Sequence, residues 1–151
     1  INRVGLCDHS ELMNLRLALD ETLVNAIIHG NLGLPSRAKG NSLDDLMQFN
    51  NLIKQRSQEA PFNTRTVRIK AELTALKASF TIEDQGDGFD WRSLPTDLED
   101  IELMANHGRG LFLIRAFMSE VRFNDKGNQI ILTKHRSEPK KTASPHPVVS
   151  N

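Results

Sequence analysis

The stretch Glu21-Thr22-Leu23-Val24-Asn25-Ala26-Ile27-Ile28-His29-Gly30-Asn31 combines helical periodicity with polar side chains that are suited to chemistry. A helix can begin at a Ser10 cap and end at Gly30, which is a natural terminator. Its apolar residues recur at helical spacing, at Leu12, Leu15, Leu19, Leu23, Ala26 and Ile27. Because Glu21 and Asn25 are four residues apart, they project from one face. The sequence therefore predicts a long helix that carries a carboxylate and an amide side by side.

A second segment, Asp84-Gln85-Gly86-Asp87-Gly88, directly follows a predicted strand. An ordinary β-turn is one interpretation. A dinucleotide fingerprint is excluded, because Trp91 stands where the third glycine is needed. An EF-hand loop is excluded too, because Phe89 and Pro95 replace the Gly and Glu that it requires. The other interpretation is an aspartate held at a strand end, with glycines that let a flat ligand lie against backbone.

A third segment, Gly108-Arg109-Gly110, precedes the apolar run from Leu111 to Met118, which predicts a helix. The free N–H groups of its first turn would face the glycines, an arrangement that binds anions. Arg109 either adds charge there or is solvated. The simplest interpretation of Glu21 and Asn25 alone is the polar outer face of a helix. His29 is better explained as a helix-end residue than as a base.

The rest of the chain predicts a sheet with an insertion. Strands at Thr66–Leu73 and Ala78–Glu83 form a hairpin with a common set of core-facing residues, namely Val67, Ile69, Ala71, Leu73, Phe80 and Ile82. Glu120–Asn124 and Gln129–Lys134 form a closing hairpin. Residues 32–63 are a polar insertion, and its helix, from Ser42 to Gln58, has one inner side, formed by Leu43, Leu46, Phe49, Asn50 and Ile53.

Two further segments have few regular signals. The stretch from Phe89 to His107 predicts a mobile lid. Residues 136–151 are rich in Pro, Lys and Ser and predict a flexible tail, which leaves residues 1–135 as one domain. The start at Ile1 rather than Met indicates a fragment with a part missing upstream.

Composition narrows the classes of function. The 151 residues have a formal net charge of zero and a pI near 7.2, so no global field favours nucleic acid or an anionic membrane. The single cysteine, Cys7, cannot form an internal disulfide, and no apolar run has the length of a spanning helix. We expect a cytoplasmic protein whose anion site, if present, is local.

The three segments, in this order, resemble the N box, G1 box and G2 box of the GHKL ATPase superfamily, which includes gyrase and histidine kinases. The His29-Gly30 ending and the run Gly108-Arg109-Gly110-Leu111-Phe112-Leu113-Ile114 are similar to the serine-kinase anti-sigma factors of the RsbW and SpoIIAB type. The resemblance extends over residues 1–134. It implies the Bergerat ATP-binding fold, an α+β two-layer sandwich with a mixed, mostly antiparallel sheet and helices on one face.

The resemblance also implies roles for individual residues. Asn25 would coordinate Mg²⁺, and Glu21 would be the general base for an attacking hydroxyl. Asp84 would accept a hydrogen bond from the adenine amine, and five residues would shape the rest of the ATP site: Gly86, Gly88, Gly108, Arg109 and Gly110. So few catalytic side chains suffice because phosphoryl transfer depends mainly on positioning and charge neutralisation.

The function implied is that of an ATP-dependent serine/threonine protein kinase domain in a bacterial partner-switching pathway. Its substrate would be a STAS-domain anti-anti-sigma protein, and the same domain would sequester a sigma factor, with no nucleic acid or membrane partner and with a homodimer allowed. Two alternatives stay open: a non-catalytic nucleotide-binding module that sequesters a regulator, and the ATP-binding domain of a histidine kinase.

Three features depart from the compact anti-sigma kinases. The insertion at residues 32–63 is longer and resembles versions attached to receiver or phosphatase modules. Asn106-His107 stands where kinase members often have an arginine. Gly127-Asn128-Gln129 stands where many relatives have Gly-Thr, so a threonine contact to adenine is not expected.

Overall fold

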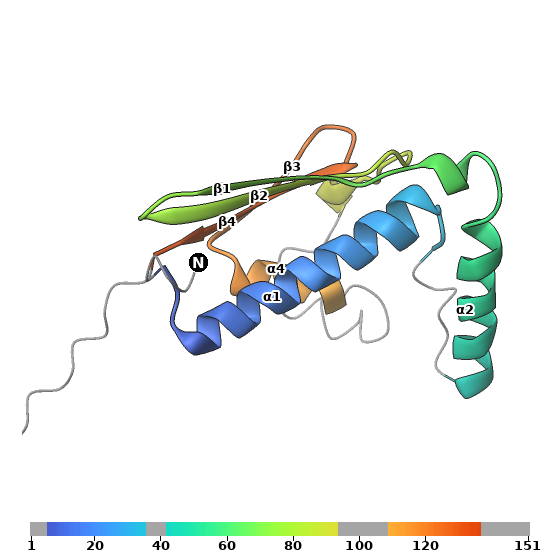
Figure 1. Cartoon of the computed structure of the whole chain (residues 1–151), viewed down its shortest axis with the longest axis horizontal. Coiled ribbons are helices and arrows are strands. Elements are labelled where there is room, and N and C mark those ends of the chain that lie inside the picture. The colour runs from blue at the N-terminus through green and yellow to red at the C-terminus, as the bar shows by residue number, and fades with distance from the viewer. Residues whose placement is uncertain (1–5, 36–41, 94–108, 137–151) are drawn as a thin grey trace, which may run out of the picture.

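A computed structural model describes residues 6–35, 42–93 and 109–136. Within these ranges four strands form one sheet in the order β1-β2-β4-β3, and helices α1 and α4 cover one of its faces (Figure 1). The strands are β1 (Arg68–Leu73), β2 (Lys77–Glu83), β3 (Glu120–Phe123) and β4 (Gln129–His135). Every strand pair among the described residues is antiparallel. The predicted α+β two-layer sandwich is confirmed.

The first helix, α1 (His9–Val24), begins two residues earlier than predicted. Its cap is Asp8 rather than Ser10: the Asp8 carboxylate accepts from Glu11 N at 2.8 Å, and Glu11 Oε2 accepts from Asp8 N at 3.0 Å. This reciprocal capping box satisfies two backbone donors at the helix start. The Ser10 hydroxyl instead donates to the Asp8 carboxylate.

The prediction that Gly30 ends the helix is also wrong. The helical path continues from α1 into a π-helical segment, η2 (Asn25–Asn31), whose wider turn is seen in the Leu32 N–H that donates to Ile27 O. Gly30 therefore lies inside the helix and has no positive φ. Ile27, one of the apolar residues at helical spacing, lies in this segment and is 47% exposed.

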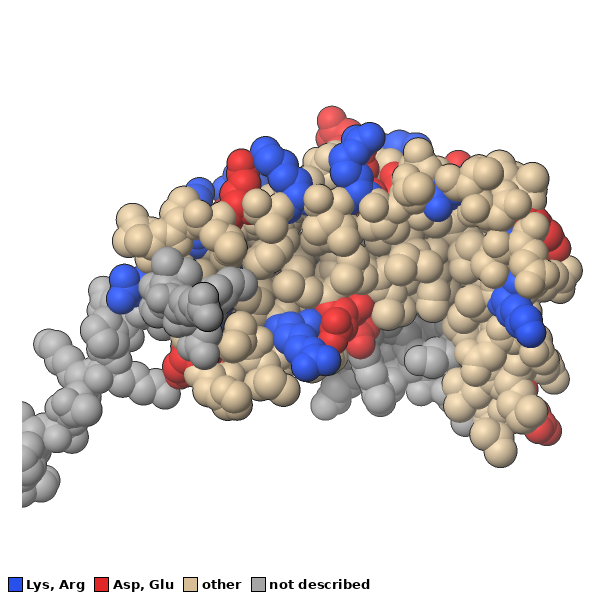
Figure 2. All heavy atoms as spheres, in the orientation of Figure 1, with Lys and Arg blue, Asp and Glu red and all other residues tan. Residues whose placement is uncertain are grey.

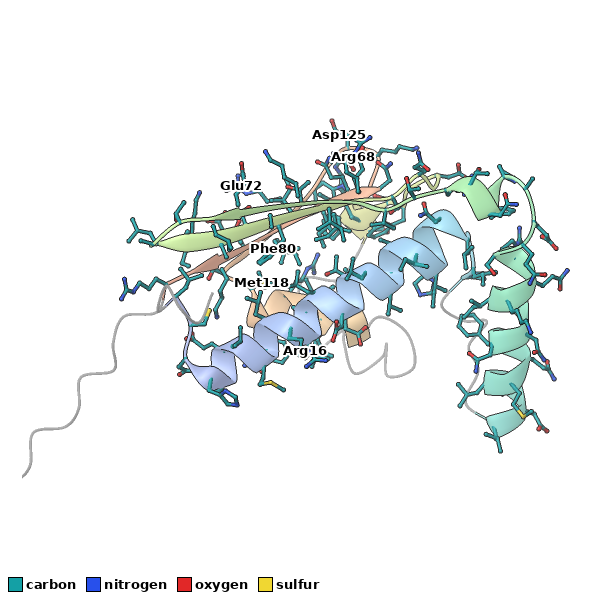
Figure 3. All side chains as sticks on the ribbon, in the orientation of Figure 1. Arg16, Arg68, Glu72, Phe80, Met118 and Asp125 are labelled. Carbon is teal, nitrogen blue, oxygen red and sulfur yellow. The ribbon has the colours of Figure 1, made fainter. Side chains whose placement is uncertain are left out.

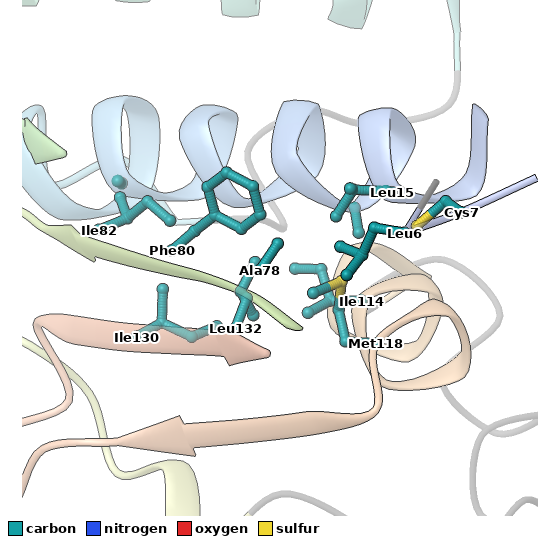
Figure 4. Packing of buried hydrophobic residues seen from close by; sticks show 12 residues of the cluster. Leu6, Cys7, Leu15, Ala78, Phe80, Ile82, Ile114, Met118, Ile130 and Leu132 are labelled. Atoms are coloured by element: carbon teal, nitrogen blue, oxygen red, sulfur yellow. The ribbon is translucent and has the colours of Figure 1, made fainter. Parts of the chain in front are cut away.

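The core lies between the sheet and the two helices that cover it, α1 and α4 (Arg109–Phe117) (Figure 4). Leu15 of α1 and Ile114 of α4 are fully buried against β2 and β4. Phe80 and Ile82 face this core, as predicted. Figure 3 shows Phe80 and Met118 between sheet and helices, whereas Arg68 and Glu72 lie on the other side of the sheet.

Strand β1 does not have the half-buried face that its alternation predicted. Ile69, Ala71 and Leu73 pair with the buried Ile82, Phe80 and Ala78 and share their side of the sheet, yet all six residues of β1 are exposed. The reason is position: β1 is an edge strand, and the buried residues of α1 pack with those of β2 and β4, the two central strands. Only Val67, just before β1, packs against the core.

The insertion forms the predicted helix, α2 (Leu43–Arg56), with Ser42 as its cap. It packs through Phe49 and Ile53 against Leu32 and Leu34, a small cluster separate from the main core. The other three residues predicted on its inner side, Leu43, Leu46 and Asn50, are exposed. The helix therefore contacts the domain along a narrower stripe than its sequence suggested.

The two faces of the sheet differ in polarity. Lys and Arg mix with Asp and Glu along its outer side, at the top of Figure 2. Arg68 pairs there with Glu83 at 3.0 Å, and Arg122 with Glu120 at 2.7 Å. Exposed pairs of this kind contribute little to stability. The outer face of the sheet thus carries paired charges, whereas α1 and α4 cover the other face.

After β2 the chain packs on the closing hairpin. Trp91, in the short helix η5 (Trp91–Ser93), stacks on Phe123 of β3, and its indole N–H donates to Asn124 O at 2.8 Å. Phe89 meets the same Phe123 ring edge to face. Most of the predicted lid, residues 94–107, and the predicted tail from residue 137 lie outside the described residues.

Candidate functional site

The end of α1 meets the start of α4 at Glu21 and Gly110. A Cβ added at Gly110 would lie 2.6 Å from Glu21 Oε2 and 3.5 Å from Asn25 Nδ2. A side chain at this position would require the Glu21 carboxylate to move aside. The carboxylate and the amide thus share one helix face, as predicted, and this face is turned to the first turn of α4, where free N–H groups create a positive end.

The other end of the same helical unit meets the end of β2. A Cβ added at Gly30 would overlap the Asp84 carboxyl group, 2.5 Å from Oδ2 and 2.6 Å from Oδ1. A Cβ at Gly86 would collide with Gly30 O. The two backbones therefore touch, and the Asp84 carboxylate lies directly on the bare backbone of η2.

Together these contacts bring two of the predicted motifs to opposite ends of one helical surface. Glu21, Asn25 and Gly110 form one group, and Asp84 with Gly86 forms the other, joined through Gly30. Carboxylate and amide oxygens can ligate a hard cation, and a carboxylate can also accept a proton. A carboxylate held at a strand end can accept from an amine.

Asp84 is held in a half-buried setting. Its Oδ1 accepts from Gly86 N at 2.8 Å. Burial raises the pKa of Asp84 above its usual value, against the opposing effects of the Gly86 N–H and of the cations Lys126 and Arg65. An additional donor at this carboxylate, such as a ligand amine, would favour its ionised form.

The turn between β3 and β4 supports the Asp84 loop from the other side. Asp84 N donates to Asn128 O, and Asn128 Nδ2 donates back to Asp84 O, both at 2.9 Å. Lys126 Nζ donates to Gly86 O at 2.9 Å. A Cβ at Gly88, whose φ is +78°, would collide with Lys126 O. The close approach of Lys126 O and the positive φ both favour glycine at position 88.

Sequence reasoning assigned no role to Asn31, Lys126 or Asn128. Asn31 is only 4% exposed, and its Oδ1 accepts from Gln85 N at 2.8 Å. The only sequence signal for Asn31 was its place at the end of the quoted helical stretch. No local pattern could reveal the other two, because the turn they occupy meets the Asp84 loop only in the folded chain.

The remaining predicted residues are placed in part. Gly110 is the second residue of α4, so this glycine lies in the first turn of a helix. Arg109 begins that helix, while Gly108 lies outside the described residues. His29 Nδ1 lies 2.5 Å from Leu34 O, which matches the helix-end role predicted for it.

Residues 6–35, 42–93 and 109–136 contain neither a cluster of metal-ligating side chains nor a membrane-spanning helix. No group of three or more His, Cys, Asp or Glu side chains there could hold a metal ion. No helix among them is both long and apolar enough to cross a membrane.

The sequence matches a known family. A family model described as the histidine kinase-like ATPase domain matches residues 48–134. The match includes Asp84, Gly86 and Gly110 but begins after Glu21 and Asn25. The connection of those two residues to the matched region thus rests on their contact with Gly110.

Curated relatives include the serine-protein kinase RsbW of Staphylococcus aureus, in strains JH9, Newman and USA300. Each is 31% identical to this chain over 80 residues, which cover 48% of this chain and 50% of the relative. The matched part thus spans about half the length of these relatives.

Proposed function

Since the chain belongs to the histidine kinase-like ATPase family, we propose that it binds ATP between its helical layer and the end of strand β2. One observation supports this proposal above the others: Gly110 abuts Glu21 while Gly30 abuts Asp84. Groups suited to the phosphates and a group suited to the base thereby lie along one helical surface.

In this proposal the Asp84 carboxylate accepts from the exocyclic amine of adenine. A carboxylate can accept this hydrogen bond, and the position of Asp84 is fixed by Gly86 N and by two hydrogen bonds to Asn128. The bare backbone of Gly30 beside it leaves room for the carboxylate itself, which lies where a side chain at position 30 would be. Gly86 and Gly88 would shape the floor beneath the ring.

The phosphates would lie toward α4. Gly108, Arg109 and Gly110 would contact them through backbone N–H groups at the helix start, which favour anions. Asn25 would hold Mg²⁺ through its side-chain oxygen, and the Glu21 carboxylate and the Asn25 amide both lie close to Gly110. When bound, the cation would neutralise phosphate charge.

We further propose that the domain is a serine/threonine protein kinase of the RsbW type. The hydroxyl oxygen of a protein serine attacks the γ-phosphorus of ATP, and the bond from that phosphorus to the oxygen bridging it to the β-phosphate breaks. Glu21 takes the hydroxyl proton. ADP leaves, and the phosphoserine remains on the substrate.

The similarity to RsbW also suggests the partners. We propose a STAS-domain anti-anti-sigma protein as the substrate and a sigma factor as the sequestered protein. The long helical insertion around α2 suggests that the full-length protein carries a receiver or phosphatase module.

Replacing Glu21 with Gln tests the catalytic part of this proposal. The variant keeps the shape of the side chain and loses its basicity, so it should bind Mg-ATP normally and phosphorylate a STAS protein at least about a hundredfold more slowly. Labelled ATP measures transfer, and calorimetry measures binding.

Asp20→Asn is the matched control. Asp20 is the neighbouring carboxylate, paired with Arg16 on the exposed side of α1. Its variant should transfer phosphate at the parent rate. Unchanged transfer by Glu21→Gln would reject Glu21 as the base, and absent ATP binding by the parent chain would reject the whole proposal.

One observation favours a second candidate, a nucleotide-binding module without transfer. The family match begins at residue 48, after Glu21 and Asn25. It therefore includes Asp84, the residue proposed to recognise adenine, but not Glu21, the residue proposed to take the proton. Such a module would bind ATP through Asp84 and sequester its partner. It would keep partner binding, and show no phosphoserine, whether or not Glu21 is present.

A further inference from the structure

We propose that Asn31 is the positioning residue that holds Asp84 in register with the helix carrying Glu21 and Asn25. The inference rests on the proposed function, because it assigns to Asn31 the precision of adenine recognition. In this proposal Asn31 contacts neither the adenine nor the phosphates of ATP, and it acts through the loop that follows β2.

The contact that carries the inference is a buried hydrogen bond. Asn31 is the last residue of η2 and is 4% exposed. Its Oδ1 accepts from Gln85 N, the first backbone donor after Asp84, at 2.8 Å. This bond attaches the Asp84–Gln85 peptide to the end of the helix.

One further contact fixes Asn31 itself, and a second fixes its partner Gln85. Arg65, which precedes β1, donates through Nη1 to Asn31 O at 2.9 Å. The side chain of Gln85 returns to the same region, where its Oε1 accepts from Thr66 N at 2.8 Å. Asn31 thus lies where the helix end, the approach to β1 and the Asp84 loop meet.

The Asp84 loop has two supports, and they constrain different things. Asn128 and Lys126 tie the loop to the β3–β4 turn and so fix Asp84 within the sheet layer. Asn31 ties the loop to the helical layer and so fixes the spacing between the layers at that end. If ATP spans from Asp84 to Glu21, the second constraint decides whether both ends are met together.

Loss of the Asn31 acceptor would leave Gln85 N without this partner. The Asn31 side chain is buried, so the Gln85 N–H could bond to water instead only if the loop moved outward. The Asp84 carboxylate, which is pressed against Gly30, would move with its neighbouring peptide. Recognition of the adenine amine would then weaken before binding of the phosphates does.

The experiment compares two ligands, Mg-ATP and the Mg complex of purine riboside triphosphate, which lacks the exocyclic amine. The parent chain should prefer ATP by about tenfold, the value of one hydrogen bond to a charged acceptor. Asn31→Leu, which matches Asn in shape and accepts no hydrogen bond, should reduce this preference to below about threefold. Its affinity for the analogue should stay near the parent value.

Two variants complete the test. Asn31→Asp keeps an acceptor oxygen and should retain most of the preference. Thr22→Val is the matched control for lost stability, because Thr22 is buried on the same helical unit and its hydroxyl donates only to Ala18 O. It should leave the preference unchanged. Asn31→Ala replaces Asn31→Leu if the latter does not fold.

An unchanged preference in Asn31→Leu, or an equal loss in Thr22→Val, would overturn the role of Asn31 and leave the proposed function standing. A parent chain that binds neither triphosphate would overturn the proposed function. A parent chain that binds both equally would overturn base recognition by Asp84, and the role of Asn31 with it.

Discussion

Asp84 shows how one residue can be suited to a ligand and unfavourable for the folded chain alone. It lies half-buried against the Gly30 backbone, where burial raises its pKa. The ionised form is therefore destabilising until a donor reaches it. Residues shaped for function commonly carry such a penalty.

Asp84→Asn should separate these two effects. The amide keeps an oxygen for Gly86 N but loses the charge, so ATP affinity should fall by about tenfold or more. The stability of the ligand-free chain at pH 7 should be equal to that of the parent or higher. Calorimetry measures the affinity, and urea unfolding measures the stability.

The sign of the pH dependence follows from the raised pKa. Because the folded-state pKa of Asp84 lies above its unfolded value, its favourable contribution is complete below the unfolded value of about 3.9 and is lost as pH rises through the folded value. The advantage of Asp84→Asn should thus be present at pH 7 and absent at about pH 3.5. A variant clearly less stable than the parent at pH 7 would contradict this account.

At the scale of elements, the start of α1 offers a direct check on its cap. Asp8→Ala should lower the free energy of unfolding by about 1 kcal/mol, because it removes the acceptor for Glu11 N. Ser10→Ala should lower it by less than about half of that, because Ser10 only supports the Asp8 carboxylate. Urea unfolding of both variants measures the difference, and the reverse order would show that the cap is misassigned.

Strands β1 and β2 allow a second comparison. Ile69 and Ile82 are paired across the two strands, but Ile69 is 56% exposed and Ile82 is 2% exposed. Ile69→Thr should change the free energy of unfolding by less than about 0.5 kcal/mol, whereas Ile82→Ala should lower it by about 2–5 kcal/mol. A loss above about 2 kcal/mol for Ile69→Thr, seen in urea unfolding, would mean that β1 is covered in solution.

The same pair shows what sequence can predict. Alternation identified both strands and the buried Phe80 and Ile82, because period-two patterning is a local property. It could not tell that Ile69 is exposed, because an edge position depends on which strands pair and where α1 packs. The prediction was right about the strand and wrong about its burial.

The helix was predicted with similar limits. Apolar spacing located α1, and the four-residue spacing correctly placed Glu21 and Asn25 on one face. The π-helical turn of η2 was not predictable, since Gly30 reads as a terminator when its real constraint is the Asp84 carboxylate. That constraint exists only after β2 has packed beside the helix.

At the scale of the whole molecule, the candidate site is a product of packing between layers. Glu21 meets Gly110 because α1 packs on α4, and Gly30 meets Asp84 because η2 continues α1 beneath the end of β2 (Figure 1). Motif order in the sequence predicted that these segments belong to one site. The contacts of Glu21 with Gly110 and of Gly30 with Asp84 could be found only in the folded chain, because these residues are far apart in the sequence.

The central claim is that both groups belong to one ATP site, and a nuclear magnetic resonance titration tests it most directly. A ¹⁵N-labelled chain is titrated with the Mg complex of a non-hydrolysable ATP analogue while the amide signals of Gly30, Gly86 and Gly110 are followed. The account predicts that all three shift together with one dissociation constant. Shifts confined to one group, or none at saturating ligand, would contradict it.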